Sequence, residues 1–449
     1  MWLLVLLALS VLFIVGMTAR FKVHPLLVLI VTAVAYGLLG GMSPGAVIAA
    51  VNAGFGGTIG NIGLVILFGA IIGVFLEKSG GAMRIAESAL ALTGPRHTPL
   101  AMTLVGYVVS IPVFCDSAFV LLSPVNKALA RRAKSTLAAG AIALSLGLYA
   151  THTMIPPTPG PVGAAGVLGA DLGLVILWGV IVAMVAALAG WGFAALVAAR
   201  VNIAPDGDAP DANAMAIPES ASEPPTTPKA LLPILLPLLL ILARSIAELP
   251  AKPLGAGEAA VIIGFLGQPV VALMIGALTA FLLPKRFDWG LLSVSGWVGQ
   301  AVAAAAPIIV ITGAGGAFGK VLQESGIADV IGSGLTGYEG IGVWLPLFIA
   351  AGIKTAQGSS TVAMITTAGL VAPLLPALGL DSPAATALCV VAIGAGGMMV
   401  SHANDSYFWV VTQFSNMSMG QGYRLQTLGT FVQGVAAALA IAVIAAMIL

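Results

Sequence analysis

The residues of this sequence that could do chemistry are a few polar side chains set inside long apolar runs. A carboxylate or an imidazole can hold and release a proton, a lysine can bind an anion, and hydroxyl or amide groups can hydrogen-bond a polar ligand. Ionisable groups in apolar surroundings are costly to bury, so each cluster is first interpreted as a functional site. There are four clusters: Asp116-Ser117, Thr151-His152 through Pro161, Lys354 through Thr361, and Ser401 through Ser406.

Asp405 and Lys354 are two charged residues deep within these clusters. Asp405 lies in a polar run interrupted only by Ala403. It is expected either to carry a proton or to cap the end of a broken helix. Lys354 precedes a group of small and hydroxylated residues. It is expected either to bind a substrate carboxylate or to extend its amine to the membrane surface.

The other titratable candidates also have two interpretations each. Asp116 either caps the tip of a hairpin or takes part in ion coupling. His152 and His402 either donate to a helix carbonyl or bind substrate or a proton, because imidazole titrates near neutral pH. The neutral residues expected to contact substrate are Ser117, Thr151, Gly358, Ser359, Ser360, Thr361 and Asn404.

The sequence gives little support for an enzyme or for a metal site. The sequence has no HExxH, GxSxG or Walker motif, and its two cysteines, Cys115 and Cys389, cannot build a zinc site. No metal, cofactor or nucleic-acid partner is therefore expected.

Composition places these clusters in a membrane. The 449 residues are 59% hydrophobic and 8% charged, against roughly 25% charged in a soluble domain. A helix needs about 20 apolar residues to cross the bilayer. Such runs occur at 2–18, 24–41, 60–77, 98–130, 136–168, 172–199, 230–247, 257–283, 297–322, 341–376, 384–412 and 425–448.

Two of these runs are predicted to be re-entrant hairpins. Polar residues lie at the centre of 98–130 and of 341–376, and irregular backbone at membrane depth must face protein or a water-filled cavity. With both as hairpins and the N-terminus outside, 14 of the 18 basic residues fall on the cytoplasmic side. Such a bias is the usual positive-inside pattern.

An internal repeat divides the chain. Residues 201–228 contain six prolines, five acidic residues and no basic residue. They are predicted to be a cytoplasmic linker between repeats at 1–200 and 229–449. The windows 65–86 and 311–332 match at seven positions, including Gly80 and Gly326. The expected fold is an all-α polytopic membrane protein. Its two inverted repeats each have about five transmembrane helices, with one re-entrant hairpin and one broken helix.

At its polar motifs the sequence resembles the gluconate permease family of proton-coupled symporters. The resemblance rests on the motifs at 114–122, 151–161, 166–171, 356–363 and 401–409, and it spares the linker. It implies import of a small anionic hydroxy acid across the bacterial inner membrane by a homodimer. Family members often have a histidine where Thr158 stands and an arginine where Lys354 stands. Glycerate or D-serine therefore stays open as cargo, and sodium stays open as the coupling ion in place of protons.

Overall fold

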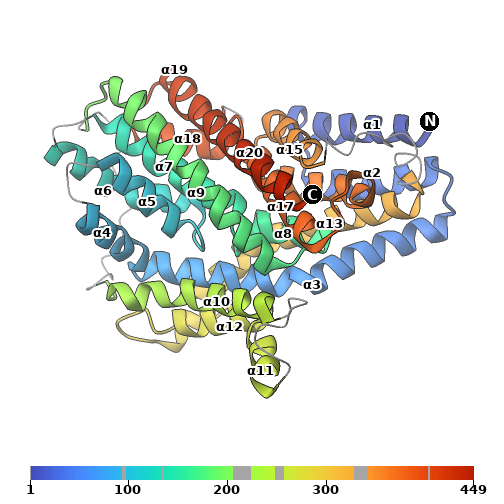
Figure 1. Ribbon diagram of the computed structural model, residues 1–449, viewed down its shortest axis with the longest axis horizontal. Coiled ribbons are helices and arrows are strands. Elements are labelled where there is room, and N and C mark those ends of the chain that lie inside the picture. The colour runs from blue at the N-terminus through green and yellow to red at the C-terminus, as the bar shows by residue number, and fades with distance from the viewer. Residues whose placement is uncertain are drawn as a thin grey trace.

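The computed structural model describes residues 2–93, 98–133, 136–205, 224–247, 257–327, 342–402 and 405–449, and these form helices joined by short connections (Figure 1). Within these ranges, five helical segments are long and apolar enough to cross a membrane, or seven if each of two bent helix pairs counts as one span. Several shorter apolar helices accompany them.

The first half of the chain contains the helices α1 to α9. Serine, threonine or aspartate side chains cap several helix starts, and proline occupies the first turn of others, where its missing N–H is not needed. The helices are α1 (Trp2–Val15), α2 (Pro25–Leu39), α3 (Pro44–Lys78), α4 (Gly81–Thr93), α5 (Thr98–Val109), α6 (Cys115–Ala133), α7 (Leu137–Met154), α8 (Pro159–Leu168) and α9 (Leu172–Leu196).

The second half follows a similar order. Its helices are α10 (Thr227–Ala247), α11 (Glu258–Leu266), α12 (Pro269–Ala280), α13 (Trp297–Glu324), α15 (Trp344–Gln357), α16 (Ser360–Val371), α17 (Pro383–Met398), α18 (Ser406–Phe414), α19 (Met419–Gly422) and α20 (Leu428–Ile448).

Two of the predicted spans differ from the observed helices. The run at 60–77 is only the second part of α3. This helix begins at Pro44, and its parts Pro44–Asn61 and Gly63–Lys78 meet at a bend of 41°. Its first part is rich in glycine and contains Asn52, so hydropathy alone does not identify it. The run at 257–283 is the bent pair α11 and α12, whose axes differ by 67°.

The two centrally polar runs each consist of two helices separated by a short break. Val109 and Cys115 flank the first break, and Gln357 and Ser360 flank the second. A non-helical stretch separates α7 from α8 at 155–158, so Thr151 and His152 are helical, and another separates α17 from α18 around Ser401. Every residue of α7, and of α17 from Ala385 onward, is buried, so these two helices form the centre of the molecule.

Helix contacts recur in matching pairs across the two halves. In these pairs α5 packs on α7 as α15 packs on α17, α2 packs on α13 as α12 packs on α3, and α8 packs on α16 as α18 packs on α6. The helices α3 and α13 pack on each other, as do α9 and α20. Gly80 after α3 and Gly326 after α13 have the same φ of 76°.

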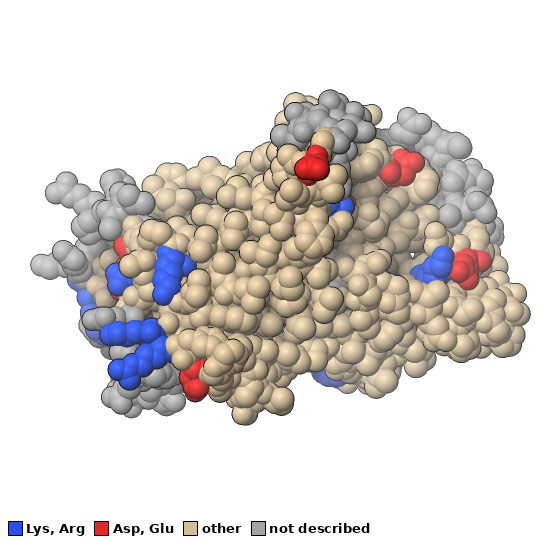
Figure 2. Space-filling model, turned by 90° about the horizontal axis from the view of Figure 1, so that it is seen from below, with Lys and Arg blue, Asp and Glu red and all other residues tan. Residues whose placement is uncertain are grey.

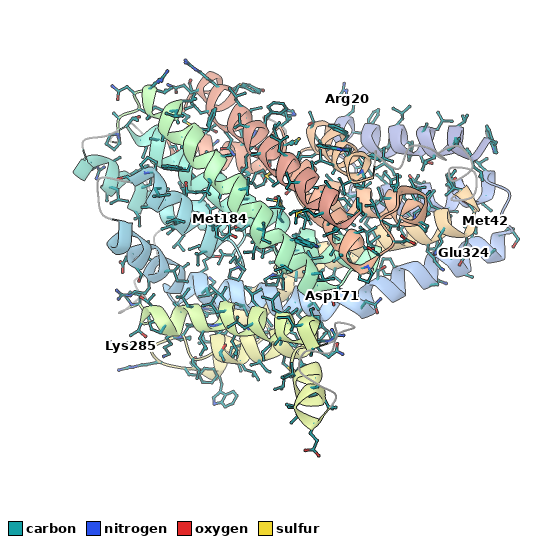
Figure 3. The ribbon with its side chains drawn as sticks, in the orientation of Figure 1. Arg20, Met42, Asp171, Met184, Lys285 and Glu324 are labelled. Atoms are coloured by element: carbon teal, nitrogen blue, oxygen red, sulfur yellow. The ribbon has the colours of Figure 1, made fainter. Side chains whose placement is uncertain are left out.

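Charged side chains are rare on the surface and gather towards its ends. On the face shown in Figure 2, lysine and arginine cluster at one end, and much of the surface between the ends is uncharged. Lys285 lies at one end of the molecule and Glu324 at the other (Figure 3). Which end faces the cytoplasm stays a prediction.

Candidate substrate site

A buried ion pair joins the end of α15 to the start of α18. Lys354 is in the last turn of α15, and Asp405 immediately precedes α18. The Lys354 Nζ atom is 2.8 Å from Asp405 Oδ2, and the side chains are 0% and 6% exposed. The alternative in which Lys354 extends its amine to the membrane surface is therefore wrong. The lysine is buried because a carboxylate neutralises it.

Asp405 is held by more than the lysine. The Ser401 hydroxyl donates to Oδ2 at 2.5 Å, and the Tyr407 backbone N–H donates to Oδ1 at 3.0 Å. Asp405 therefore caps α18, as one of its two interpretations expected, and pairs with Lys354 as well. Three donors fix the carboxylate, so its orientation is determined before any ligand binds.

A second carboxylate faces the same pair. Asp116 lies in the first turn of α6, and its charge interacts with both Asp405 and Lys354. Its Oδ1 atom is buried and has no hydrogen-bond partner among the described residues. With all three groups ionised the cluster carries a net charge of −1 (one lysine, two aspartates). A cation or a proton would neutralise it.

Two side chains from the end of α7 complete this side of the cluster. His152 is 6% exposed, and its Nδ1 atom has no partner among the described residues. Tyr149, one turn earlier, is 1% exposed, and its ring centroid lies 5.0 Å from that of Tyr407. The charge of Asp405 acts on both His152 and Tyr149. Four elements therefore meet here: α6, α7, α15 and the start of α18.

The tip between α15 and α16 adds small hydroxylated residues. Gly358 ends α15 with φ of 95°, a left-handed conformation that glycine adopts without strain. The Ser359 hydroxyl then caps α16 by accepting from Val362 N at 3.3 Å. Ser360 lies beside the Tyr149 side chain. Thr361, like Ser117 in the first turn of α6, is partly buried.

Two other residues predicted to bind substrate, His402 and Thr151, contact backbone carbonyls of the protein, and a third lies outside the described residues. The His402 Nε2 atom contacts the Thr355 carbonyl at 2.8 Å, which fits its structural interpretation. The Thr151 hydroxyl donates to the Leu148 carbonyl of its own helix at 3.2 Å. Asn404 lies outside the described residues. The described part of the chain contains no group of three or more His, Cys, Asp or Glu placed to hold a metal ion.

The break between α7 and α8 is short. Only Ile155 through Thr158 are non-helical, and Pro159 through Pro161 form the first turn of α8. Proline fits there because first-turn N–H groups need no helical acceptor. The Thr158 hydroxyl donates to the Ile155 carbonyl at 2.6 Å.

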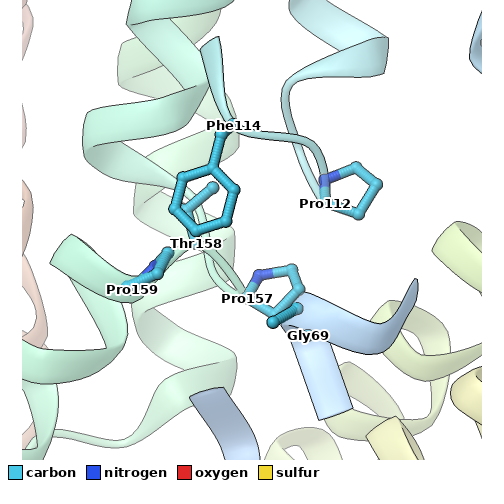
Figure 4. Close-up of a pocket in the computed structure, with 7 residues that line it drawn as sticks. Gly69, Pro112, Phe114, Pro157, Thr158 and Pro159 are labelled. Carbon is cyan, nitrogen blue, oxygen red and sulfur yellow. The ribbon is translucent and has the colours of Figure 1, made fainter. Parts of the chain in front are cut away.

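A small recess lies against this break (Figure 4). It is lined by Gly69, Ala70, Pro112, Phe114, Pro157, Thr158 and Pro159. In Figure 4 the chain enters at Pro112 and leaves from Phe114 towards the same side, as a hairpin tip does. The Phe114 ring is 6.0 Å from that of His152, so the recess adjoins the polar cluster.

Sequence reasoning missed the aromatic residues that pack around this cluster. Tyr149, Tyr407 and Phe114 stand in apolar stretches where a ring fits a packed helix, so their types carry no signal. It also did not pair Lys354 with Asp405, which are 51 residues apart.

Comparison with known proteins identifies related sequences over nearly the whole chain. The family model described as GntP family permease matches residues 2–448. A gluconate permease of Pseudomonas aeruginosa is 36% identical over 91% of this chain and 90% of its own. The inner membrane permease YgbN of Escherichia coli is 33% identical over 92% of each chain. The D-serine transporter DsdX of Escherichia coli is 32% identical over 97% of this chain and 96% of its own.

Solved structures share the fold at lower identity. MtrF of Neisseria gonorrhoeae, described within a class of antimetabolite efflux pumps, matches with a TM-score of 0.68 and 16% identity over 96% of each chain. The YdaH transporter of Alcanivorax borkumensis matches with a TM-score of 0.66 and 14% identity, over 95% of this chain and 99% of its own.

Proposed function

Because this chain belongs to the GntP family of permeases, we propose that it imports a small hydroxy carboxylate, gluconate or a related sugar acid, by proton symport. The chain is a transporter and not an enzyme, and it is a multi-pass protein of the inner membrane. The cargo, the coupling ion and the transport mechanism are proposals.

The observation that carries the proposal is the buried pair of Lys354 and Asp405. A carboxylate cargo needs a cation to replace its lost hydration, and Lys354 is the buried cation at this site. When the cargo's carboxylate binds Lys354, it takes the place of Asp405. The Asp405 carboxylate would then be a buried and unpaired charge, and uptake of a proton removes that charge. Cargo binding and proton binding thereby favour each other.

The second carboxylate supports coupling to a cation. Asp116 already gives the cluster a net negative charge, and an anionic cargo makes it more negative. Protons at Asp116, Asp405, His152 or His402 are the proposed compensation. Sodium at the same oxygens, with backbone carbonyls of the broken helices, is the alternative.

The cargo's hydroxyl groups have several proposed partners. Ser359, Ser360 and Thr361 lie at the start of α16, and Ser117 lies at the start of α6. Thr151, Asn404 and the backbone at Gly358 are the others proposed. Helix starts also suit an anion because their N–H groups carry partial positive charge.

Movement of the site is proposed to follow an alternating-access mechanism. The matching contacts of α5 with α7 and of α15 with α17, and the equal φ at Gly80 and Gly326, support two inverted repeats related by a pseudo-two-fold axis. In this proposal 1–200 and 229–449 are the repeats, 201–228 is a cytoplasmic linker, and the helix breaks are re-entrant tips that meet near the midplane. A homodimer is proposed on the family resemblance.

Uptake into proteoliposomes tests the function. Purified protein is reconstituted, labelled D-gluconate is added outside, and a proton or a sodium gradient is imposed. Proton-driven uptake that an uncoupler abolishes supports the proposal. Sodium-driven uptake supports the alternative coupling. Failure with both ions rejects gluconate as the cargo.

A second cargo class deserves the same assay, because one relative at 32% identity is a D-serine transporter. Gluconate, glycerate and D-serine share a carboxylate with a polar substituent on the neighbouring carbon. Competition by unlabelled glycerate and D-serine against each labelled acid ranks the three. A carrier returns each compound unchanged, whereas an enzyme would release a product.

A further inference from the structure

Tyr149 has a buried hydroxyl that the fold itself does not use. Its side chain is 1% exposed, and its OH atom has no hydrogen-bond partner among the described residues. Ser360 lies beside it, but without the geometry of a hydrogen bond. Leaving a buried hydroxyl unpaired is unfavourable, because the group loses its hydrogen bonds to water and gains none in the protein. A phenylalanine would fill the same space without that cost, so folding gives no reason for a tyrosine here.

Tyr407 provides the contrast. Its ring lies 5.0 Å from that of Tyr149 and is equally buried, yet its hydroxyl donates to the Ser145 carbonyl at 3.0 Å. One tyrosine of this pair therefore serves the fold. The other keeps its donor and acceptor free.

The unpaired hydroxyl has unpaired neighbours. Asp116 Oδ1 and His152 Nδ1 are also buried without partners among the described residues. Other buried atoms without partners exist elsewhere in the described chain, such as those of Thr366 and Gln433, but these three belong to residues on which the charge of Asp405 acts. Polar atoms left open around a buried cation are expected where a polar ligand completes the site.

The position of Tyr149 indicates which part of a ligand it meets. The backbone N–H of Tyr407 binds Asp405 Oδ1 and Lys354 binds Asp405 Oδ2, so Tyr149 packs against a residue that holds the Asp405 carboxylate in place. On the proposed function, the cargo's carboxylate takes that place. The carbon next to the carboxylate is then the part of the cargo nearest to Tyr149.

We infer that the Tyr149 hydroxyl hydrogen-bonds the substituent on the carbon next to the cargo's carboxylate, and so restricts the protein to carboxylates that carry a polar group there. A phenol both donates and accepts, so it serves a hydroxyl or an ammonium equally. This inference rests on the proposed function and names its specificity-determining residue.

The test compares Tyr149→Phe with the wild type on paired acids that differ only at this carbon. The pairs are D-gluconate with 2-deoxy-D-gluconate, and D-glycerate with 3-hydroxypropionate, each measured by uptake or competition in proteoliposomes. Tyr149→Phe should raise the KM for each 2-hydroxy acid about tenfold, because it removes one well-placed hydrogen bond. It should leave the KM for each deoxy acid unchanged, so the preference for the 2-hydroxy acid disappears.

Tyr407→Phe is the matched control. It removes a hydroxyl that bonds the protein, so it should lower the melting temperature and keep the preference for the 2-hydroxy acid. Tyr149→Phe should melt no lower than the wild type.

The remaining outcomes of the uptake assay contradict either the inference about Tyr149 or the proposed function. An equal loss for the hydroxy and deoxy acids, or an unchanged preference in Tyr149→Phe, overturns the inference and leaves the proposed function standing. A wild type that takes up D-glycerate but not D-gluconate rejects gluconate, while the glycerate pair still tests Tyr149. A wild type that takes up none of these acids overturns both.

Discussion

The Lys354 Nζ and Asp405 Oδ2 atoms lie 2.8 Å apart in the interior, and they join two elements that are separate in the sequence. Lys354 ends α15, whereas Asp405 begins α18. One ion pair therefore connects the end of α15 to the start of α18. If cargo binds Lys354, this connection opens, so ligand binding is linked to the relative position of the two elements.

Removing one member of the pair should destabilise the protein. Lys354→Ala leaves Asp405 as a buried unpaired charge, at a cost of about 3–5 kcal/mol. The double variant Lys354→Ala/Asp405→Ala should recover much of the loss in melting temperature, measured in detergent, yet remain inactive in uptake. Lys320→Ala is the control, since the Lys320–Glu324 pair is exposed and worth only about 0–1 kcal/mol. Equal melting of Lys354→Ala and the wild type would contradict the energetic role of the pair.

Asp405→Asn should separate the charge of this residue from its capping role. Asparagine keeps an oxygen that can accept from the Tyr407 N–H, so α18 should stay capped. The group can no longer take up a proton, so uptake should fall and lose its dependence on external pH. Asp171→Asn, which changes a cap at the start of α9, is the control. Normal uptake with an intact pH profile would remove Asp405 from the proton pathway.

Gly358→Ala should disturb the tip between α15 and α16. The position has φ of 95°, and a Cβ there costs roughly 1–2 kcal/mol because it crowds the following carbonyl. The tip should shift, and the KM for the cargo should rise. Gly352→Ala, on the same helix with open space around its Cβ, should behave as the wild type. If both variants transport alike, the tip does not shape the site.

Gly73→Ala should act on the other tip. A Cβ at Gly73 would lie 2.5 Å from the Pro112 carbonyl oxygen, so α3 and the α5–α6 tip could not keep their present approach. Overpacking of this kind costs about 1–3 kcal/mol. Uptake should decrease along with the melting temperature. Gly60→Ala on the same helix meets no atom within 4 Å and is the control. A Gly73→Ala protein with unchanged uptake would show that this close approach is dispensable.

The sequence by itself determined the class of the protein and the place of its polar clusters. Apolar runs of bilayer length can be recognised because lipid requires about 20 apolar residues in series, and proline or paired polar residues within such a run disrupt a helix. The positions of Asp116, His152, Lys354 and Asp405 follow from this reasoning. So does the non-helical stretch at Ser401.

Tertiary structure decided which of these residues meet and what each one contacts. Hydropathy alone does not identify the first part of α3, because its glycine and asparagine residues, such as Asn52, Gly56 and Gly57, lower the mean hydropathy although they lie exposed on the helix surface. The pairing of Lys354 with Asp405 depends on how two distant elements pack, and no local pattern encodes a contact across 51 residues. The same holds for Tyr149. Its type suits any packed helix, and only its burial beside the ion pair, with a hydroxyl that the fold leaves unpaired, distinguishes it from Tyr407.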